Sequence, residues 1–196
     1  MTPHFATILA DPPWRTKSGR LTGRNAFVDG YSGPNRPLPY QPMSVAAIAA
    51  LPVASLAATA GAHLWLWTIN GYIEAALQII RAWGFTYSTT HVWSKAPMGG
   101  GLGESFGITT EFLLFARRGR APMRNRTTGT CHTWPRRYVN GAPAHSKKPE
   151  GSYALIEHAS PGPYVELFSR EDQPRLGWSY WGNESLGTAE LALGVG

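Results

Sequence analysis

The sequence has a single cysteine and no long apolar run. Because Cys131 is alone among 196 residues, an internal disulfide and a zinc cluster built on several thiolates are both excluded. No window holds the roughly 18 uncharged apolar residues that a membrane-spanning helix needs. The N-terminus reaches an apolar stretch and a proline turn too soon to leave room for a secretion signal. We therefore expect a protein of a reducing, cytoplasmic compartment that does not enter a membrane.

Acidic residues are also scarce, and the basic residues that outnumber them lie mostly in two stretches. The chain has 18 Lys and Arg against 12 Asp and Glu, a formal net charge of +6. Both stretches, about residues 15–42 and 117–148, are rich in Gly, Pro, Ser, Thr and Asn, so we expect them to be loops. Aromatic residues lie among the cations. This mixture favours contact with a phosphate backbone and stacked bases, with cationic loops kept for solubility as the open alternative.

Strand and helix patterns alternate along the chain. The stretch "HLWLWT", residues 63–68, is apolar on both faces, which is typical of a strand at the centre of a parallel sheet. Other strands are expected at 5–10, 85–93, 111–117 and 164–169, and helices at 45–51, 73–83 and 150–159. The alternation predicts one doubly wound α/β domain over 1–196, with a tail at 187–196 that we expect to be poorly ordered.

The stretch Asp11-Pro12-Pro13-Trp14 follows the first predicted strand directly. Each proline fixes φ at about −65° and removes a backbone donor, so the chain must stop and turn there. Ligands of doubly wound sheets bind beyond the carboxyl ends of strands, where the strand order reverses. An aspartyl nucleophile for phosphoryl transfer is a second interpretation, but the second acid expected for it is missing. A capping acid, two turn prolines and a core tryptophan make up the purely structural interpretation.

A series of motifs resembles the MT-A70 family of adenine-N(6) methyltransferases, which includes bacterial and phage DNA enzymes. "DPPW" after an apolar strand is similar to the acid-Pro-Pro-aromatic motif of amino methyltransferases. "LPYQPMS", "HLWLWTIN", "VWSK", "TEFLLFARRG", "HSKKPE", "ELFSR" and "GNE" then follow in family order, over about residues 5–186. The resemblance implies a Rossmann-like methyltransferase sheet with helices on both faces. It also implies a permuted motif order, with the catalytic motif first and the cofactor strand last.

The resemblance implies S-adenosylmethionine as the cofactor and the exocyclic amine of adenine as the methyl acceptor. The Asp11 carboxylate and the Pro12 carbonyl would each accept one hydrogen bond from the amine. These two bonds would aim the nitrogen lone pair at the methyl group. Pro12 and Pro13 would hold that carbonyl rigidly. Trp14 would offer a flat face to a flipped base. The expected catalytic residues are therefore Asp11, Pro12, Pro13 and Trp14.

The same resemblance implies which residues bind the cofactor and the nucleic acid. In the family, the basic residue of a Lys-Pro pair approaches the methionine carboxylate, and a strand like "ELFSR" ends below the cofactor. The expected cofactor residues are Asp11, Lys148, Phe168, Ser169, Arg170, Asn183 and Glu184. The expected substrate residues are Trp14, Tyr40, Arg136, Arg137 and His145.

DNA is the expected substrate, because the basic stretch between Trp14 and Tyr40 is long and suits an extended backbone. The same reaction on RNA stays open, since phosphate contacts carry no information about the sugar. A catalytically silent nucleic-acid-binding subunit is a third possibility, against which the intact Asp11 argues. Cys131 and His132 are too few ligands for a metal, so none is expected. Monomer and homodimer are both compatible with the sequence.

Overall fold

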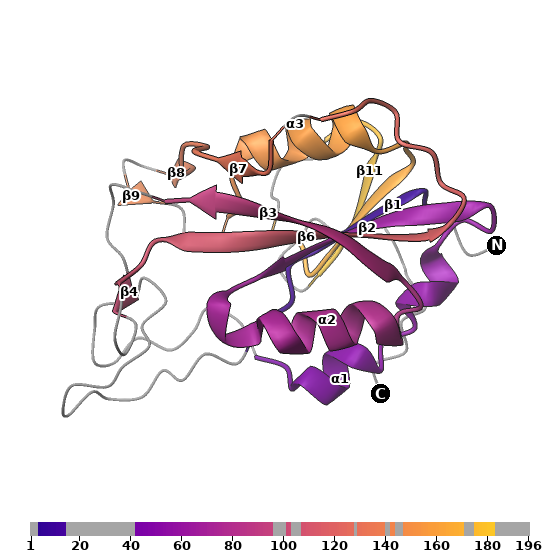
Figure 1. Ribbon diagram of the computed structural model, residues 1–196, viewed down its shortest axis with the longest axis horizontal. Helices are drawn as coiled ribbons and strands as arrows, with labels where there is room; N and C mark the ends of the chain where they lie inside the picture. Colours follow the sequence, from indigo (N-terminus) through magenta and orange to yellow (C-terminus); the bar gives the residue numbers. More distant parts are fainter. Residues whose placement is uncertain are drawn as a thin grey trace.

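The described part of the chain is built on a seven-stranded sheet with helices on both faces (Figure 1). The computed structural model describes residues 4–14, 42–95, 101–102, 107–127, 129–139, 142–143, 147–170 and 175–182. In the order β11-β10-β1-β2-β6-β3-β7, the strands are Trp178–Trp181, Tyr164–Leu167, Thr7–Ala10, Gly61–Thr68, Thr110–Gly119, Thr86–Ser94 and Cys131–His132. Two small sheets pair β4 (Gly101–Leu102) with β5 (Gly107–Ile108) and β8 (Tyr138–Val139) with β9 (Ala142–Pro143).

All strands of the large sheet point the same way except β6, which is antiparallel to both β2 and β3. From β1 the chain moves to β2 on one side, whereas from β10 it moves to β11 on the other. The strand order therefore reverses between β1 and β10, whose last residues, Ala10 and Leu167, are paired. Open α/β sheets bind ligands at such a reversal, outside the carboxyl ends of the strands.

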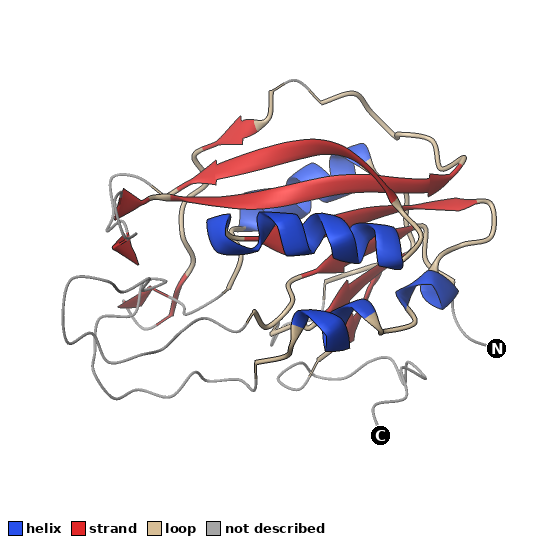
Figure 2. Cartoon of the chain, turned by 60° about the horizontal axis from the view of Figure 1, so that its bottom comes forward, coloured by secondary structure: helices blue, strands red, loops and turns tan. Residues whose placement is uncertain are grey.

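Each face of the sheet has its own hydrophobic core. Helices α1 (Val45–Ala49) and α2 (Ile73–Ala82) cover one face, and α3 (Glu150–Ala159) covers the other (Figure 2). Successive residues of a strand point to opposite faces. Leu64 and Leu66 of β2 accordingly pack in the core under α1 and α2, while Trp65 and Trp67 pack in the core under α3. The 3₁₀ turn η1 (Val53–Leu56) follows α1 in the sequence, and the 3₁₀ turn η2 (Asn70–Tyr72) directly precedes α2.

The ends of the helices follow local signals in the sequence. Ser44 caps α1, since its hydroxyl accepts a hydrogen bond from the Ala47 N–H at 3.1 Å. After α2 the chain passes through Gly84 at φ 76°, a left-handed conformation that glycine adopts without strain. No helix in the described part of the chain is long and apolar enough to cross a membrane.

The α/β class with helices on both faces is confirmed, and several boundaries are corrected. The helix expected at 45–51 ends at Ala49, and the strand expected at 111–117 runs from Thr110 to Gly119. Residues 117–119 of the predicted basic loop 117–148 are therefore part of the sheet. The central strand β2 has a parallel neighbour on one side only, since β6 is antiparallel. Strands β7 and β11 were not predicted, because short strands of mixed polarity have little periodicity.

Candidate active site

The turn after β1 is fixed by backbone hydrogen bonds. The Asp11 N–H donates to the Leu167 carbonyl at 3.4 Å, and the Trp14 N–H donates to the Pro12 carbonyl at 2.8 Å. The Met43 N–H donates to the Pro13 carbonyl at 3.0 Å and ties the turn to the residues before α1. Because a carbonyl oxygen has two lone pairs, Pro12 keeps the capacity to accept one more hydrogen bond. The turn therefore holds Asp11 rigidly beyond the carboxyl end of β1.

Trp14 lies in the core, where the residue is only 5% exposed. Its Nε1 donates to the Trp67 carbonyl at 3.3 Å, and its ring stacks on Tyr72 with centroids 4.9 Å apart. The prediction of an open face for a flipped base is therefore wrong for Trp14. Burial of this large ring under α1 and α2 stabilises the fold more than an exposed position beside the turn would.

Four alternating charges meet beyond the carboxyl edge of the sheet. Lys148 Nζ lies 3.1 Å from Asp11 Oδ1 and 3.0 Å from Glu111 Oε2, and Lys95 Nζ lies 2.8 Å from Glu111 Oε1. They come from the end of β1, the end of β3, the start of β6 and the segment before α3. Since β6 is antiparallel to its neighbours, its first residues reach the same edge as the ends of β1 and β3. We call this group the charge quartet.

Burial and mutual attraction shift the pKa values within the charge quartet. Burial raises the pKa of Asp11 above its ordinary value, while the positive charges of Lys148 and Arg170 oppose that shift. Burial would also raise the pKa of Glu111, but Lys148 and Lys95 together lower it to about 2. For Lys148, the attraction of Asp11 and Glu111 overcomes burial and raises the pKa. Glu111 and Lys148 are thus charged at neutral pH, and Asp11 depends on Lys148 for its ionisation.

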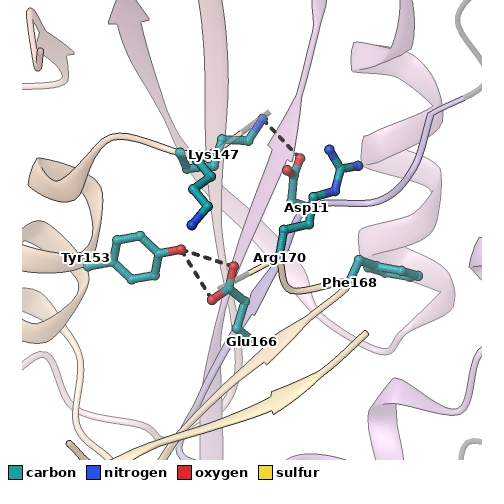
Figure 3. A pocket seen from close by; sticks show the side chains of 7 residues that line it. Asp11, Lys147, Tyr153, Glu166, Phe168 and Arg170 are labelled. Carbon is teal, nitrogen blue, oxygen red and sulfur yellow. Dashed lines mark hydrogen bonds and ion pairs between the residues drawn. The ribbon is translucent and has the colours of Figure 1, made fainter. Parts of the chain in front are cut away.

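A pocket lies beside Asp11, at the point where the strand order reverses. Its lining consists of Asp11, Lys147, Lys148, Tyr153, Glu166, Phe168 and Arg170. Figure 3 shows the Tyr153 hydroxyl pointing at the Glu166 carboxylate, to which it donates at 3.1 and 3.3 Å. Glu166 is 4% exposed and belongs to β10. The pocket therefore combines two carboxylates with three cationic side chains.

The chain after β10 has an unusual backbone. Phe168 has φ 61°, which costs a side-chain-bearing residue about 1–2 kcal/mol relative to ordinary conformations. The Ser169 N–H donates to the Trp181 carbonyl at 3.0 Å, and a Cβ on Gly182 would stand 2.5 Å from the Ser169 carbonyl oxygen. This close approach requires glycine at position 182. The turn after β10 places both Phe168 and Arg170 in the lining of the pocket.

The structure brings together part of the predicted site. Asp11, Lys148, Phe168 and Arg170 line one pocket, while Ser169 is buried beside it. Other predicted residues, Tyr40, His145, Asn183 and Glu184, lie outside the described residues. The partly exposed Arg136 and Arg137 follow β7, which is parallel to β3, so they too lie beyond the carboxyl edge of the sheet.

Sequence reasoning missed four polar residues at this edge. Lys95 and Glu111 stand in the quoted motifs "VWSK" and "TEFLLFARRG", and Lys147 precedes the predicted Lys148. Tyr153 reads from the sequence as a core residue of α3. Charged residues at the ends of strong apolar strands were the available signal, since the ends of strands meet at one edge of the sheet.

His132 is paired with another histidine. His91 Nδ1 and His132 Nε2 are 3.0 Å apart, and the His132 ring stacks on Trp134 with centroids 4.0 Å apart. Within the described ranges, no group of three or more His, Cys, Asp or Glu residues could hold a metal ion. These contacts anchor the segment that leads to Arg136 and Arg137.

The fold and the site define a class of protein. This class has a mixed α/β sheet with an acid-Pro-Pro turn at the strand-order reversal and a pocket of mixed charge beside it. A family model described as MT-A70 matches residues 5–184. The chain therefore belongs to the MT-A70 family, and its sheet is a Rossmann-like methyltransferase sheet.

Named relatives agree with this family. The N(6)-adenine-specific methyltransferase METTL4 of Homo sapiens is 25% identical over 190 residues, which cover 93% of this chain and 38% of the relative. A putative N(6)-adenosine-methyltransferase MT-A70-like protein of Medicago truncatula is 27% identical over 198 residues, with 97% and 28% covered. A Drosophila melanogaster MT-A70-like protein is 26% identical, with 92% and 27% covered. The chain thus spans between a quarter and two fifths of these relatives' lengths.

Proposed function

We propose that this chain transfers a methyl group from S-adenosylmethionine to the N(6) amine of adenine in DNA. The observation that carries the proposal is the position of Asp11. Its carboxylate lies at the strand-order reversal, on a proline-fixed turn, and it lines a pocket of mixed charge together with its ion-pair partner Lys148. Membership of the MT-A70 family supports the same reaction.

The residues of the pocket fit the proposed cofactor. Its methionine portion carries a carboxylate and an ammonium group, and the pocket offers Lys147 and Arg170 for the first and Glu166 for the second. Glu166 keeps acceptor capacity beyond its bonds from Tyr153, because an ionised carboxylate has about four lone-pair sites. When bound, the cofactor supplies an electrophilic methyl group on a sulfonium. Asn183 and Glu184 remain the residues proposed for the ribose hydroxyls, and Phe168 and Ser169 remain proposed contacts.

Asp11 and Pro12 act on the adenine amine as hydrogen-bond acceptors. The amine is a poor nucleophile because its lone pair is delocalised into the ring. When the Asp11 carboxylate and the Pro12 carbonyl each accept one N–H, the nitrogen lone pair turns out of the ring plane and towards the methyl group. Both acceptors are held by the turn before the substrate arrives, so little reorganisation is needed. Pro13 keeps the Pro12 carbonyl in place.

Lys148 has a role different from the one that the resemblance implied. Its ammonium is already shared by Asp11 and Glu111, and it lies 5.1 Å from the Trp67 ring centroid. A cation that is already shared by two carboxylates is a weak partner for a third carboxylate. We therefore propose that Lys148 keeps Asp11 ionised and fixes its orientation, with the methionine carboxylate as a secondary contact.

The basic segments would bind the nucleic acid. Arg136 and Arg137 lie at the edge where Asp11 is found, and the basic stretch of about residues 15–42 follows the catalytic turn in sequence. Tyr40 and His145 stay proposed substrate contacts. RNA is the second candidate, because two of the relatives are named adenosine methyltransferases, whereas METTL4 is named adenine-specific.

Methyl transfer from tritiated S-adenosylmethionine tests the proposal directly. Single- and double-stranded DNA and RNA of matched sequence are the four substrates, and nucleoside analysis identifies the product. N(6)-methyldeoxyadenosine from DNA is the expected product. N(6)-methyladenosine from RNA alone would reassign the substrate. A chain that binds all four nucleic acids and methylates none would be a silent subunit.

A further inference from the structure

Arginines of the predicted basic loop 117–148 lie at two opposite edges of the sheet. Arg136 and Arg137 lie beyond the carboxyl ends of the strands, as Asp11 does. β6 runs the other way and ends at Gly119, next to the first residue of β2, Gly61. Figure 1 shows the arrowheads of β3 and β6 at opposite ends of the sheet. The arginines near the end of β6 are therefore far from the proposed active site.

The second group of cations lies at the amino edge of the sheet, and we call these residues the amino-edge arginines. Arg117 and Arg118 are successive residues of β6, so their side chains flank this edge on opposite faces of the sheet. Arg117 is paired with Thr86, the first residue of β3, and Arg118 with Ala62, near the start of β2. A Cβ built on Gly84, which follows the last turn of α2, would lie 3.8 Å from the Arg118 Nη1. The amino-edge arginines are Arg81, Arg117, Arg118 and Arg120, all of them exposed.

Two of these side chains are held in place although they are exposed. The Arg118 Nη1 donates to the Ala54 carbonyl at 2.9 Å, and the Arg117 guanidinium lies 5.9 Å from the Phe115 ring centroid. A guanidinium that is already ordered gives up less entropy when it binds a partner. Its planar fork of N–H donors matches the oxygen atoms of a phosphate.

Acidic residues that could neutralise these arginines lie elsewhere in the described part of the chain. Asp11, Glu111 and Glu166 belong to the opposite edge, and Glu74 and Glu150 stand in the first turns of their helices. Glu157 in α3 binds Trp178 and lies 3.9 Å from Arg175. The amino-edge arginines form no ion pair with any of these acids.

We propose that the amino-edge arginines bind the phosphate backbone of the nucleic acid at a distance from the adenine that is methylated. This inference rests on the proposed function. Glu111 and Arg118 are separated along β6 by roughly 24 Å, at about 3.4 Å per residue. A duplex advances about 3.4 Å per base pair, so on a duplex that runs along β6 the contacted phosphates lie roughly seven base pairs from the target.

A phosphate backbone fits these arginines better than an acidic protein does. Protein interfaces have an apolar or aromatic centre that supplies most of the affinity. The large hydrophobic side chains exposed in the described part are Tyr87, Tyr138 and Leu176, and of these only Tyr87 lies near the start of β3. Arginines without an apolar centre are typical of electrostatic contacts with nucleic acid.

The test compares two sets of substitutions on substrates of two lengths. The triple variant Arg117→Gln, Arg118→Gln, Arg120→Gln removes three amino-edge charges, and Arg136→Gln, Arg137→Gln is the comparison at the active-site edge. Salt-dependent affinity is measured on a duplex of about 30 base pairs, long enough to reach both edges. KM for methyl transfer is measured on that duplex and on a single-stranded hexanucleotide. If the triple variant melts at a lower temperature than the wild type, the single variant Arg120→Gln replaces it in these measurements.

For the long duplex, the triple variant is expected to reduce the log–log salt slope by about 0.9 for each phosphate that it no longer neutralises. Its KM for the long duplex rises, while its KM for the hexanucleotide equals that of the wild type. The Arg136, Arg137 variant raises KM for both substrates. An unchanged salt slope in the triple variant overturns the inference and leaves an acidic protein as the candidate partner of these arginines. An equal rise of KM on both substrates overturns the inference as well. If the wild type transfers no methyl group, the proposed function fails while the salt slope still decides this inference.

Discussion

Lys148 Nζ lies 3.1 Å from Asp11 Oδ1, and the two side chains are only 13% and 14% exposed. An ion pair this buried is costly unless further partners satisfy it. Glu111 supplies that partner for Lys148 at 3.0 Å, and Lys95 balances Glu111 in turn. Asp11 therefore shares the positive charge of Lys148 with Glu111. The protonation of Asp11 should respond in opposite directions to the removal of Lys148 and the removal of Glu111.

Replacing Lys148 by Met should move the acid limb of the pH–rate profile to higher pH. Burial already raises the pKa of Asp11, and Lys148 opposes that shift. Without the ammonium the carboxylate stays protonated to a higher pH, and a protonated oxygen accepts fewer hydrogen bonds from the amine. Single-turnover rates measured across pH, with Lys148→Arg as the charge-conserving control, check this. A uniform loss of rate with no displacement of the limb would contradict the role given to Lys148.

Replacing Glu111 by Gln should move the same limb to lower pH. The negative charge of Glu111 raises the pKa of Asp11, and its removal also leaves Lys148 entirely to Asp11. We expect the rate at neutral pH to fall, because an Asp11 oxygen held more tightly by Lys148 is less available to the amine. The opposite displacements of Lys148→Met and Glu111→Gln are the distinguishing result. Limbs that move in the same direction would show that the two residues act only through the fold.

Glu111 should also make the folded state sensitive to acid. Its pKa is about 2 in the folded protein against an ordinary 4.5, so the unfolded chain binds more protons between these values. The stabilisation is complete above the ordinary pKa and is lost as the pH falls towards 2. It amounts to about 3 kcal/mol, since one pKa unit corresponds to about 1.4 kcal/mol. Asp11, with its raised pKa, contributes with the opposite sign.

Denaturant unfolding of the wild type and of Glu111→Gln at several pH values isolates this contribution. The difference in free energy of unfolding between the two proteins should be largest near neutral pH and should shrink as the pH falls below about 4.5. A difference that stays constant over that range would mean that Glu111 is not ionised more readily in the folded state.

Trp14 should matter for stability more than for substrate affinity. Truncation of a buried tryptophan costs about 3–5 kcal/mol, and Trp14 is 5% exposed. Trp14→Ala is expected to lower the free energy of unfolding by that amount. Trp14→Phe should be less destabilised, because it keeps an aromatic ring on Tyr72 and gives up part of the indole ring and the Nε1 bond to the Trp67 carbonyl. A stable Trp14→Phe variant with a strongly raised KM would restore the base-stacking role.

The sheet was readable from the sequence where apolar runs are bounded by turn residues. The stretch "HLWLWT" indicated β2, and the helix expected at 150–159 is α3 with the same limits. The antiparallel direction of β6 was not readable, since "TEFLLFARRG" has the same apolar pattern in either direction. That direction decides which residues face the site. It places Glu111 beside Lys148 and carries Arg117 and Arg118 to the far edge.

The candidate site was predictable where it follows one strand and was missed where it combines several. Asp11 and Phe168 come directly after β1 and β10, so motif and strand end coincide. The charge quartet joins residues from four separate elements, and its pairs depend on strand register and side-chain geometry that no local pattern contains. Trp14 was assigned to the substrate because its neighbours carry the chemistry, yet the apolar ring packs into the core instead.

The most direct test of the account compares wild-type protein with Asp11→Asn and Asp11→Ala in single-turnover methyl transfer to adenine. An amide at position 11 keeps a carbonyl acceptor for the amine, whereas alanine removes it. The adenine amine is too weakly acidic to lose a proton before the methyl group arrives, so no base is needed at that step. We predict that Asp11→Asn keeps a measurable rate, lower by about tenfold to a thousandfold, and that Asp11→Ala falls to background. Equal loss of rate in both variants, with S-adenosylmethionine still bound, would contradict the acceptor role of Asp11.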